Sequence, residues 1–170
     1  MINQTEISVR DALAQIVIRK PSVKDGVALA DLIQRCPPLD HNSLYCNLLQ
    51  CSMFADTAVV AYLGSQLVGA VTGFLKPSDP DTLFVWQVAV APDARGNNLA
   101  GAMVRTILKE HPQVRFFETT ITAENRASES TFTRLARSLN CKISRRIIFD
   151  QTHHFAGHHA SEVLWKLGPF

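Results

Sequence analysis

The stretch PDARGNNLAGAMVRTIL, residues 92–108, carries two arginines, two glycines and a single acidic residue. It follows an apolar run and continues into a helical pattern, so its loop leads into a helix start. A helix start presents free backbone N–H groups and a partial positive charge, which together bind phosphate. Gly96, Ala100 and Gly101 leave room for a ligand, and Arg95 adds a cation. The stretch predicts a phosphate site, with a glycine-rich turn that binds nothing as the alternative.

Two common phosphate motifs do not fit this loop. The P-loop requires Gly-Lys-Ser or Gly-Lys-Thr at the helix start, and neither follows here. The dinucleotide fingerprint requires G-x-G-x-x-G spacing, which is also missing.

Apolar periodicity predicts the elements that must position the loop. The expected strands are 16–20, 57–64, 66–75, 83–92, 114–123, 142–149 and 162–170, with a loop at 76–81. The expected helices are one after Ser22 that ends at Cys36-Pro37-Pro38, then 42–53, the one that follows the phosphate loop to about Glu110, and 127–140. Ser22 and Asp25 have capping-box spacing.

The run LFVWQVAVAP, residues 83–92, is so uniformly apolar that it predicts a central strand buried on both faces. Three strands able to pair antiparallel precede a βαβ step around the phosphate loop. This order predicts an α/β (α+β) fold with a mixed sheet.

Length and composition indicate one globular domain. The chain has 170 residues, of which 46% are apolar and 19% charged. We expect an N-terminal extension at 1–15 and a single domain at 16–170. The net charge of +2, from 17 basic and 15 acidic side chains, is too balanced for a nucleic-acid-binding protein.

Location is predicted from what the sequence lacks. No apolar run approaches the ~20 residues that span a bilayer, and the first residues contain no signal-peptide core. The four cysteines, Cys36, Cys46, Cys51 and Cys141, have no CxxC spacing. We expect buried free thiols in a cytoplasmic protein without membrane contact.

The segment Arg95-Gly96-Asn97-Asn98-Leu99-Ala100 resembles the acyl-CoA pyrophosphate loop of the GNAT superfamily of N-acetyltransferases. Asn98 departs from the usual glycine, but asparagine tolerates left-handed geometry. The strand that follows leads to Asn125, Ser128 and Phe132, in the order and spacing of the superfamily. The resemblance implies a splayed, mostly antiparallel sheet of six to seven strands with about four helices.

The resemblance also implies acetyl-CoA as co-substrate. The implied binding residues are Val88, Ala89, Val90, Arg95, Gly96, Asn97, Asn98, Leu99, Ala100, Gly101, Asn125, Ser128 and Phe132. Many members have Tyr at the last position as an acid for the leaving thiolate, a role that Phe132 cannot fill. A thiol with a pKa of ~8.5 is a good leaving group, so solvent can protonate it.

Further stretches are similar to one branch, the L-2,4-diaminobutyrate acetyltransferases of ectoine synthesis. They are CPPLDHNSLYCNLLQC at 36–51, LFVWQVAVAP at 83–92, FETTITAENRAS at 117–128, and His159-x-x-Glu162-Val-Leu-Trp. The resemblance implies transfer of acetyl to the N4 amine of diaminobutyrate, and a homodimer.

Such an acceptor needs carboxylates for its amines and donors for its carboxylate. The expected substrate-binding residues are Asp40, Asn42, Ser43, Tyr45, Trp86, His159 and Glu162. Asp40 suits an ammonium, Ser43 and the helix start suit a carboxylate, and Tyr45 offers a hydroxyl or a ring face. A helix cap at Asp40 and an ordinary first-turn role for Ser43 are the alternatives.

The expected catalytic groups are the amide of Val88, Trp86 and Glu162. The Val88 N–H would stabilise the thioester oxyanion, and Trp86 would lie beside the acceptor amine. Glu162 is the first candidate for the base and Glu118 the second. We expect direct attack by the amine, and no metal, because the paired histidines of 153–159 lack ligand spacing.

Two alternatives remain. The first is an acetyltransferase for another small amine or a peptide. The second is a non-catalytic acyl-CoA sensor, which Asn98 and Phe132 favour as departures from the superfamily pattern.

Overall fold

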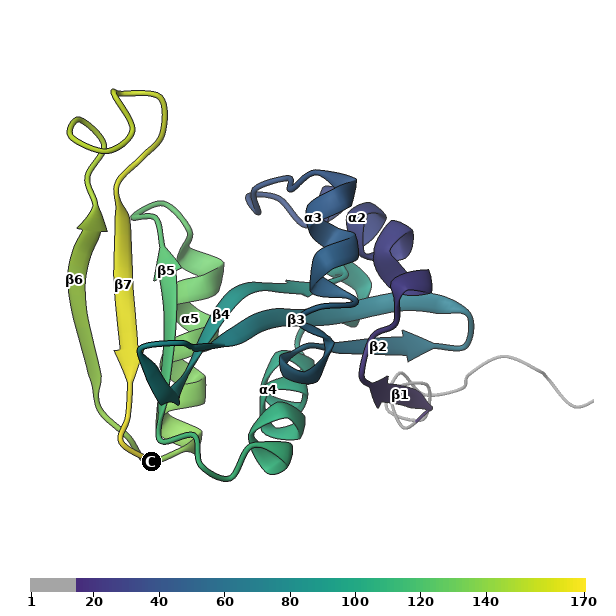
Figure 1. Ribbon diagram of the computed structural model, residues 1–170. Helices are drawn as coiled ribbons and strands as arrows, with labels where there is room; N and C mark the ends of the chain where they lie inside the picture. The colour runs from purple at the N-terminus through teal and green to yellow at the C-terminus, as the bar shows by residue number, and fades with distance from the viewer. Residues whose placement is uncertain (1–14) are drawn as a thin grey trace, which may run out of the picture.

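The computed structural model describes residues 15–170, and the predicted extension at 1–15 lies outside them except for its last residue. One sheet of seven strands runs through the molecule in the order β1-β2-β3-β4-β5-β7-β6 (Figure 1). The strands are β1 Ile16–Arg19, β2 Val59–Leu63, β3 Gln66–Lys76, β4 Asp79–Val90, β5 Phe116–Ile121, β6 Ile143–Phe149 and β7 Glu162–Leu167. All neighbours pair antiparallel except β4 and β5, which are parallel, so the predicted mixed sheet is confirmed.

The predicted loop at 76–81 is wrong. β3 continues to Lys76 and β4 begins at Asp79, so only two residues turn the chain. A register shift at Leu75/Lys76 makes this compatible with Pro80, because an irregular pair tolerates a residue without an N–H group.

Strands β4 and β5 diverge after a short contact, and this opens the sheet (Figure 1). They pair only from Thr82 to Phe84 on β4. Ala91 N–H donates to Val68 of β3 at 2.9 Å, and N–H groups alternate in direction along a strand. The N–H groups of Val90 and Val88 therefore point away from β3, into the opening.

The opening also corrects the prediction that 83–92 is buried on both faces. Trp86 is 44% exposed, and Gln87 and Val88 are half-buried. Their side of β4 has no strand against it beyond the short contact with β5, so the apolar run lines a cleft instead of a closed core.

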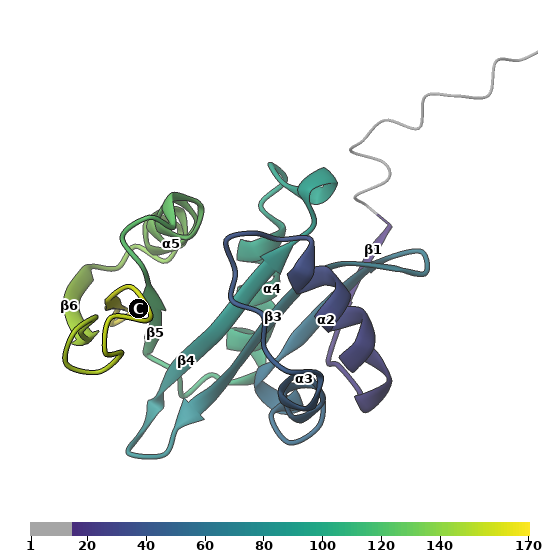
Figure 2. The ribbon, with the colours of Figure 1, turned by 90° about the horizontal axis from the view of Figure 1, so that it is seen from above.

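Helices cover the two faces of the sheet unequally. The four α-helices are α2 Gly26–Gln34, α3 Leu44–Gln50, α4 Leu99–Glu110 and α5 Arg126–Ser138. Figures 1 and 2 show α2 and α3 over one face of the β1–β4 half, α4 under the opposite face, and α5 behind β5. The core forms between these layers, with Leu32, Met103 and Phe117 fully buried. No described helix is long and apolar enough to cross a membrane.

The first helix begins at the predicted capping box. Ser22 precedes a short 3-10 turn, and the Asp25 carboxylate accepts the Ser22 N–H at 2.7 Å. Arg19 donates two hydrogen bonds to the same carboxylate, at 2.8 and 2.9 Å, and holds the pKa of Asp25 well below its usual range. This ties β1 to the helix and fixes where the following loop at 36–43 starts.

Candidate active site

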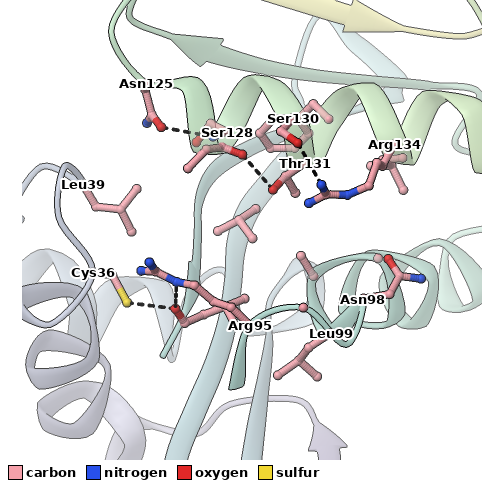
Figure 3. Close-up of a pocket in the computed structure, with 18 of the residues that line it drawn as sticks. Cys36, Leu39, Arg95, Asn98, Leu99, Asn125, Ser128, Ser130, Thr131 and Arg134 are labelled. Carbon is pink, nitrogen blue, oxygen red and sulfur yellow. Dashed lines mark hydrogen bonds between the residues drawn. The ribbon is translucent and has the colours of Figure 1, made fainter. Parts of the chain in front are cut away.

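A cavity of about 240 Å³ lies between the start of α4, the helix α5 and the loop after α2 (Figure 3). Among the described residues, Arg95 and Arg134 are the only Lys, Arg, Asp or Glu side chains that line it, and we call it the arginine cavity. Arg95 Nε donates to the carbonyl of Val90 at 3.1 Å, and Arg134 donates to Ser130 Oγ at 2.8 Å. The cavity is positively charged and suits an anionic ligand.

The predicted phosphate loop forms one wall of this cavity. Gly96 has a φ of +86° and Asn98 a φ of 56°, so both are left-handed, as expected for this loop. Asn98 is the N-cap of α4, and Leu99, Ala100 and Gly101 of the first turn line the cavity. The free N–H groups of a helix start thus lie beside the arginines.

Gly101 has a second role besides leaving room at the cavity. A Cβ at this position would meet Asn98 Oδ1 at 2.5 Å and Arg105 Nη1 at 3.2 Å. The glycine therefore makes room for the Asn98 side chain, and so for the left-handed turn, before it makes room for a ligand.

Asn97 and Ala89 do not line the cavity, which corrects two predicted contacts. The Asn97 side chain donates to the carbonyl of Arg95 at 3.0 Å and stabilises the loop itself. Ala89 is 2% exposed and pairs with Ala70 of β3.

The opposite wall comes from the start of α5. Asn125 is its N-cap and accepts the Ser128 N–H at 3.1 Å. Phe132 is 3% exposed and packs on Phe117 with 5.5 Å between ring centroids. A phenyl ring without a hydroxyl group thus occupies the position where a tyrosine could donate a proton to the leaving thiolate.

A second, larger cleft of about 1060 Å³ lies in the opening between β4 and β5. Asp40, Glu124 and Glu162 line it, no Lys or Arg of residues 15–170 does, and we call it the acidic cleft. Its remaining walls are largely aromatic, formed by Phe74, Phe84, Trp86, Phe149 and Phe155.

The two cavities meet where six residues line both, namely Pro38, Leu39, Val88, Asn125, Ser128 and Phe132. The Val88 N–H points into the opening of the sheet at this junction. A group that enters from the arginine cavity can therefore meet a group from the acidic cleft beside a free backbone donor.

Three polar side chains converge in the acidic cleft. Ligand atoms of Asp40, His159 and Glu162 all lie within 4.8 Å of one another. His159 Nε2 is 3.4 Å from the Asp40 carboxylate and 3.9 Å from Glu162. A hydrogen bond from Nδ1 to the Ala160 carbonyl, at 2.7 Å, is the main cause that raises the pKa of His159, and the two carboxylates add to it.

This cluster can bind either an ammonium group or a divalent metal ion. With Nδ1 donating to a carbonyl, neutral His159 presents a lone pair at Nε2 next to two carboxylates. An ammonium needs three acceptors for its three N–H groups, which is this set. One imidazole and two carboxylates are also ligands that divalent metals accept.

Gln87 of β4 fixes the loop that carries Asp40. Its Nε2 donates to the Asp40 carbonyl at 2.7 Å, and its Oε1 accepts from Asn42 Nδ2 at 2.8 Å. Both ends of the amide are used, so the position of the loop is set relative to the strand that carries Val88.

Comparisons with known proteins agree with this geometry. The acetyltransferase (GNAT) family model matches residues 27–136. An L-2,4-diaminobutyric acid acetyltransferase from Methylotuvimicrobium alcaliphilum is 48% identical over 163 residues, which cover 95% of each chain. Another from Halomonas elongata is 41% identical and covers 96% of this chain and 88% of its own.

The chain belongs to the L-2,4-diaminobutyric acid acetyltransferases of the GNAT family. A solved structure of the diaminobutyrate acetyltransferase EctA from Paenibacillus lautus, in complex with L-2,4-diaminobutyric acid and coenzyme A, is 35% identical. It superposes with a TM-score of 0.85 over 91% of this chain and 95% of that one. The predicted GNAT fold is therefore confirmed.

Within this GNAT fold, two predicted acceptor contacts lie outside the cleft. Ser43 is the N-cap of α3, and its hydroxyl accepts the Cys46 N–H at 3.1 Å. Tyr45 is 71% exposed and lines neither cavity. The sequence left open a cap at Asp40 and a first-turn role for Ser43, but Ser43 itself is the cap, and α3 turns Tyr45 toward solvent.

The second candidate for the base is also displaced from the site. Glu118 is 4% exposed and forms ion pairs with Lys76 at 2.8 Å and Lys166 at 3.5 Å. It lines a third cavity with Arg145 and Arg146, apart from the acidic cleft. Two ammonium groups engage its carboxylate, and it does not face the acceptor's cleft.

Sequence reasoning missed Gln87 and Glu124, which both line the acidic cleft. Gln87 is the single polar side chain within LFVWQVAV, and a polar residue inside an apolar strand was an available signal. Glu124 directly precedes Asn125, but nothing in its local pattern separates it from a solvated loop acid.

Proposed function

We propose that this chain transfers acetyl from acetyl-CoA to the N4 side-chain amine of L-2,4-diaminobutyrate, yielding the N4-acetyl derivative for ectoine synthesis. The observation that carries the proposal is the junction of two cavities of opposite charge at the Val88 N–H. The names of the similar proteins, and the acceptor and coenzyme A bound in the Paenibacillus lautus protein, support it.

Acetyl-CoA occupies the arginine cavity in this proposal. The loop from Arg95 to Gly101, without Asn97, holds the pyrophosphate through backbone N–H groups and the Arg95 guanidinium. The pantetheine arm runs between Leu39 and the start of α5, along Asn125 and Ser128. This route leads the thioester to the junction.

The acceptor occupies the acidic cleft. Asp40 pairs with the ammonium that does not react, and Trp86 and Asn42 line the walls around it. His159 lies between Asp40 and Glu162 and orients both carboxylates. No step requires a metal, because the charges of the cleft already match those of a diamine.

The reaction begins when the acceptor amine loses a proton. Its pKa of ~10.4 makes the neutral form cost about 4–5 kcal/mol at pH 7. Glu162, whose side chain is 14% exposed, accepts this proton directly or through water. The neutral nitrogen then attacks the thioester carbonyl, and the Val88 N–H stabilises the oxyanion.

Collapse of the tetrahedral intermediate breaks the C–S bond and releases the thiolate of coenzyme A. Phe132 has no proton to give, so solvent protonates the thiolate, which is a good leaving group at its pKa of ~8.5. Glu162 passes the first proton to solvent and then takes the second amine proton.

Direct attack is proposed over an acyl-enzyme. Cys36 is the one cysteine that lines the arginine cavity, and its Sγ donates to the Val90 carbonyl at 3.3 Å. Burial raises the pKa of Cys46, and that of Cys51 to about 11, so their thiolates are scarce at neutral pH. Sequential kinetics, retained in Cys36→Ser, are expected, and ping-pong kinetics would contradict direct attack.

Residues 16–170 act as one domain in this proposal, in the cytoplasm and as a homodimer. All four cysteines are free, which fits a reducing compartment. The dimer follows from the resemblance, and light scattering at assay concentration tests it.

Release of coenzyme A thiol from acetyl-CoA tests the function, with L-2,4-diaminobutyrate, ornithine, lysine and a peptide amine as acceptors. We expect a strong preference for diaminobutyrate. Activity on the other amines alone would support an acetyltransferase for a different acceptor. Binding of coenzyme A without release in any mixture would support the sensor.

A further inference from the structure

The basic side chains line one cavity and the acidic side chains line the other. This separation determines which charged groups of the acceptor meet an opposite charge. The arginine cavity has two arginines and, within the described chain, no carboxylate. The acidic cleft has three carboxylates, while the described lysines and arginines all lie elsewhere. L-2,4-diaminobutyrate has two amines and one carboxylate, so only its amines meet opposite charge.

The histidines of the cleft do not restore the balance. His159 uses Nδ1 for the Ala160 carbonyl, and its Nε2 faces two carboxylates. His154 uses Nδ1 to accept the Asp150 N–H at 2.8 Å. His159 therefore has no free edge for a substrate carboxylate, and His154 has only its Nε2 left to offer.

A cluster of cations in the third cavity is already engaged by other groups. Lys76 and Lys166 pair with Glu118, and Arg145 packs over the ring of Trp165 at 3.6 Å. These residues line the third cavity and not the acidic cleft. A carboxylate in the cleft would have to rely on polar donors such as Thr120 and on water.

We infer that this site, if it acts as proposed above, also acetylates short diamines that have no carboxylate. The second ammonium is the group that the cleft recognises, and the acceptor carboxylate contributes little. The chemical class is a primary diamine with three carbons between its nitrogens, the spacing found in diaminobutyrate. One ammonium group loses a proton, its neutral nitrogen attacks the thioester and the C–S bond breaks, so the products are the monoacetyl diamine, coenzyme A thiol and one proton.

Two analogues that each lack one group test this inference. 1,3-Diaminopropane keeps both amines and lacks the carboxylate, whereas 4-aminobutyrate keeps the carboxylate and the reacting amine and lacks the second amine. Because a hydrogen bond to a charged group changes binding by roughly 10- to 100-fold, kcat/KM for 1,3-diaminopropane should exceed that for 4-aminobutyrate by at least about tenfold. It should lie within about tenfold of the value for diaminobutyrate.

Asp40→Asn locates the effect in the cleft. The ratio of kcat/KM for 1,3-diaminopropane to that for 4-aminobutyrate should fall about tenfold, while the affinity for coenzyme A, measured by calorimetry, stays unchanged. Asp56→Asn is the matched control, because Asp56 is 86% exposed, pairs with Lys20 and lies outside the cleft. It removes the same charge and should leave the ratio as it was.

The possible results distinguish failure of the diamine inference from failure of the proposed function. If diaminobutyrate is acetylated and 4-aminobutyrate is used as well as or better than 1,3-diaminopropane, the inference is overturned and the function stands. An unchanged ratio in Asp40→Asn overturns the role of the cleft charge. If no amine, diaminobutyrate included, releases coenzyme A thiol, the proposed function itself fails.

Discussion

The arginine cavity and the acidic cleft are built in different ways. One wall of the arginine cavity, with Arg95, is a single contiguous loop and helix start at residues 95–101, and it faces the segment 125–135 that carries Arg134. The acidic cleft is assembled from segments far apart in the chain, at 38–42, 84–88, 119–125 and 149–162. The loop wall of the arginine cavity depends on local backbone geometry and the acidic cleft on long-range contacts, so mutations should affect them differently.

Glu162→Gln should reduce activity more than any other substitution, through the acidic cleft alone. The amide cannot accept a proton, so kcat should fall by about 10²–10⁴. The KM for acetyl-CoA should stay near its normal value, because Glu162 does not line the arginine cavity. Steady-state kinetics with both substrates varied would show this, and a fall of less than threefold would remove Glu162 as the base.

Gly101→Val is the corresponding change on the arginine side. The new Cβ would collide with Asn98 Oδ1, and the left-handed turn would have to shift. The KM for acetyl-CoA should rise roughly 10-fold or more, as expected when several backbone hydrogen bonds are misplaced. Gly64→Val is the control, since a Cβ there meets nothing within 4 Å, while its φ of +59° makes a side chain strained at a site away from both cavities. Equal effects of both variants would attribute the loss to general instability.

These two regions also differ in how far the sequence predicts them. The loop was predicted with its left-handed Asn98, because backbone geometry depends on neighbours in the chain, although predicted Asn97 does not line the cavity. Of the acceptor residues, Asp40, Asn42, Trp86, His159 and Glu162 line the cleft, but Ser43 and Tyr45 do not. The direction in which α3 turns its side chains depends on its packing against α2, which no local pattern reports.

Gln87 also could not be predicted from local sequence, because its hydrogen-bond partners, Asn42 and Asp40, lie 45 and 47 residues earlier in the chain. Gln87→Leu should remove both hydrogen bonds to the loop and raise the KM for diaminobutyrate by about 10-fold, with a smaller change in kcat. The KM for acetyl-CoA should not move. Gln66→Leu on β3 is the control, since Gln66 is exposed at the start of its strand. A loss of kcat alone would mean that Gln87 acts on the reacting atoms and not through the loop.

A change of pH should affect the acidic cleft and not the arginine cavity, with a smaller effect than the substitutions above. His159 has a pKa raised above the ordinary value of 6.5, chiefly by the Ala160 carbonyl and further by Asp40 and Glu162. Below this pKa the imidazolium proton occupies the side that faces the two carboxylates and competes with the acceptor ammonium. The kcat/KM for diaminobutyrate should therefore rise several-fold as pH increases through the raised pKa.

The KM for acetyl-CoA should not show this inflection. His159→Gln should abolish it for the acceptor, whereas His158→Gln, at an exposed neighbouring position, should preserve it. An inflection that survives in His159→Gln would belong to another group.

Asn98→Gly should have the smallest effect, although Asn98 is the departure from the superfamily loop. A non-glycine residue in left-handed geometry costs about 1–2 kcal/mol, and asparagine less, because its side chain can hydrogen-bond locally. Glycine would relieve this strain but would lose about 0.5–1 kcal/mol through greater freedom of the unfolded chain. The two terms nearly cancel, so Tm should move by no more than about 2 °C.

The KM for acetyl-CoA should also stay within about twofold in Asn98→Gly, since the turn keeps its φ of 56° and Gly101 already accommodates the asparagine. A tenfold lower KM in the variant would instead show that the Asn98 side chain obstructs the arginine cavity. The loop would then be tuned by a side chain, as the acidic cleft is, and the contrast between the two regions would be one of degree.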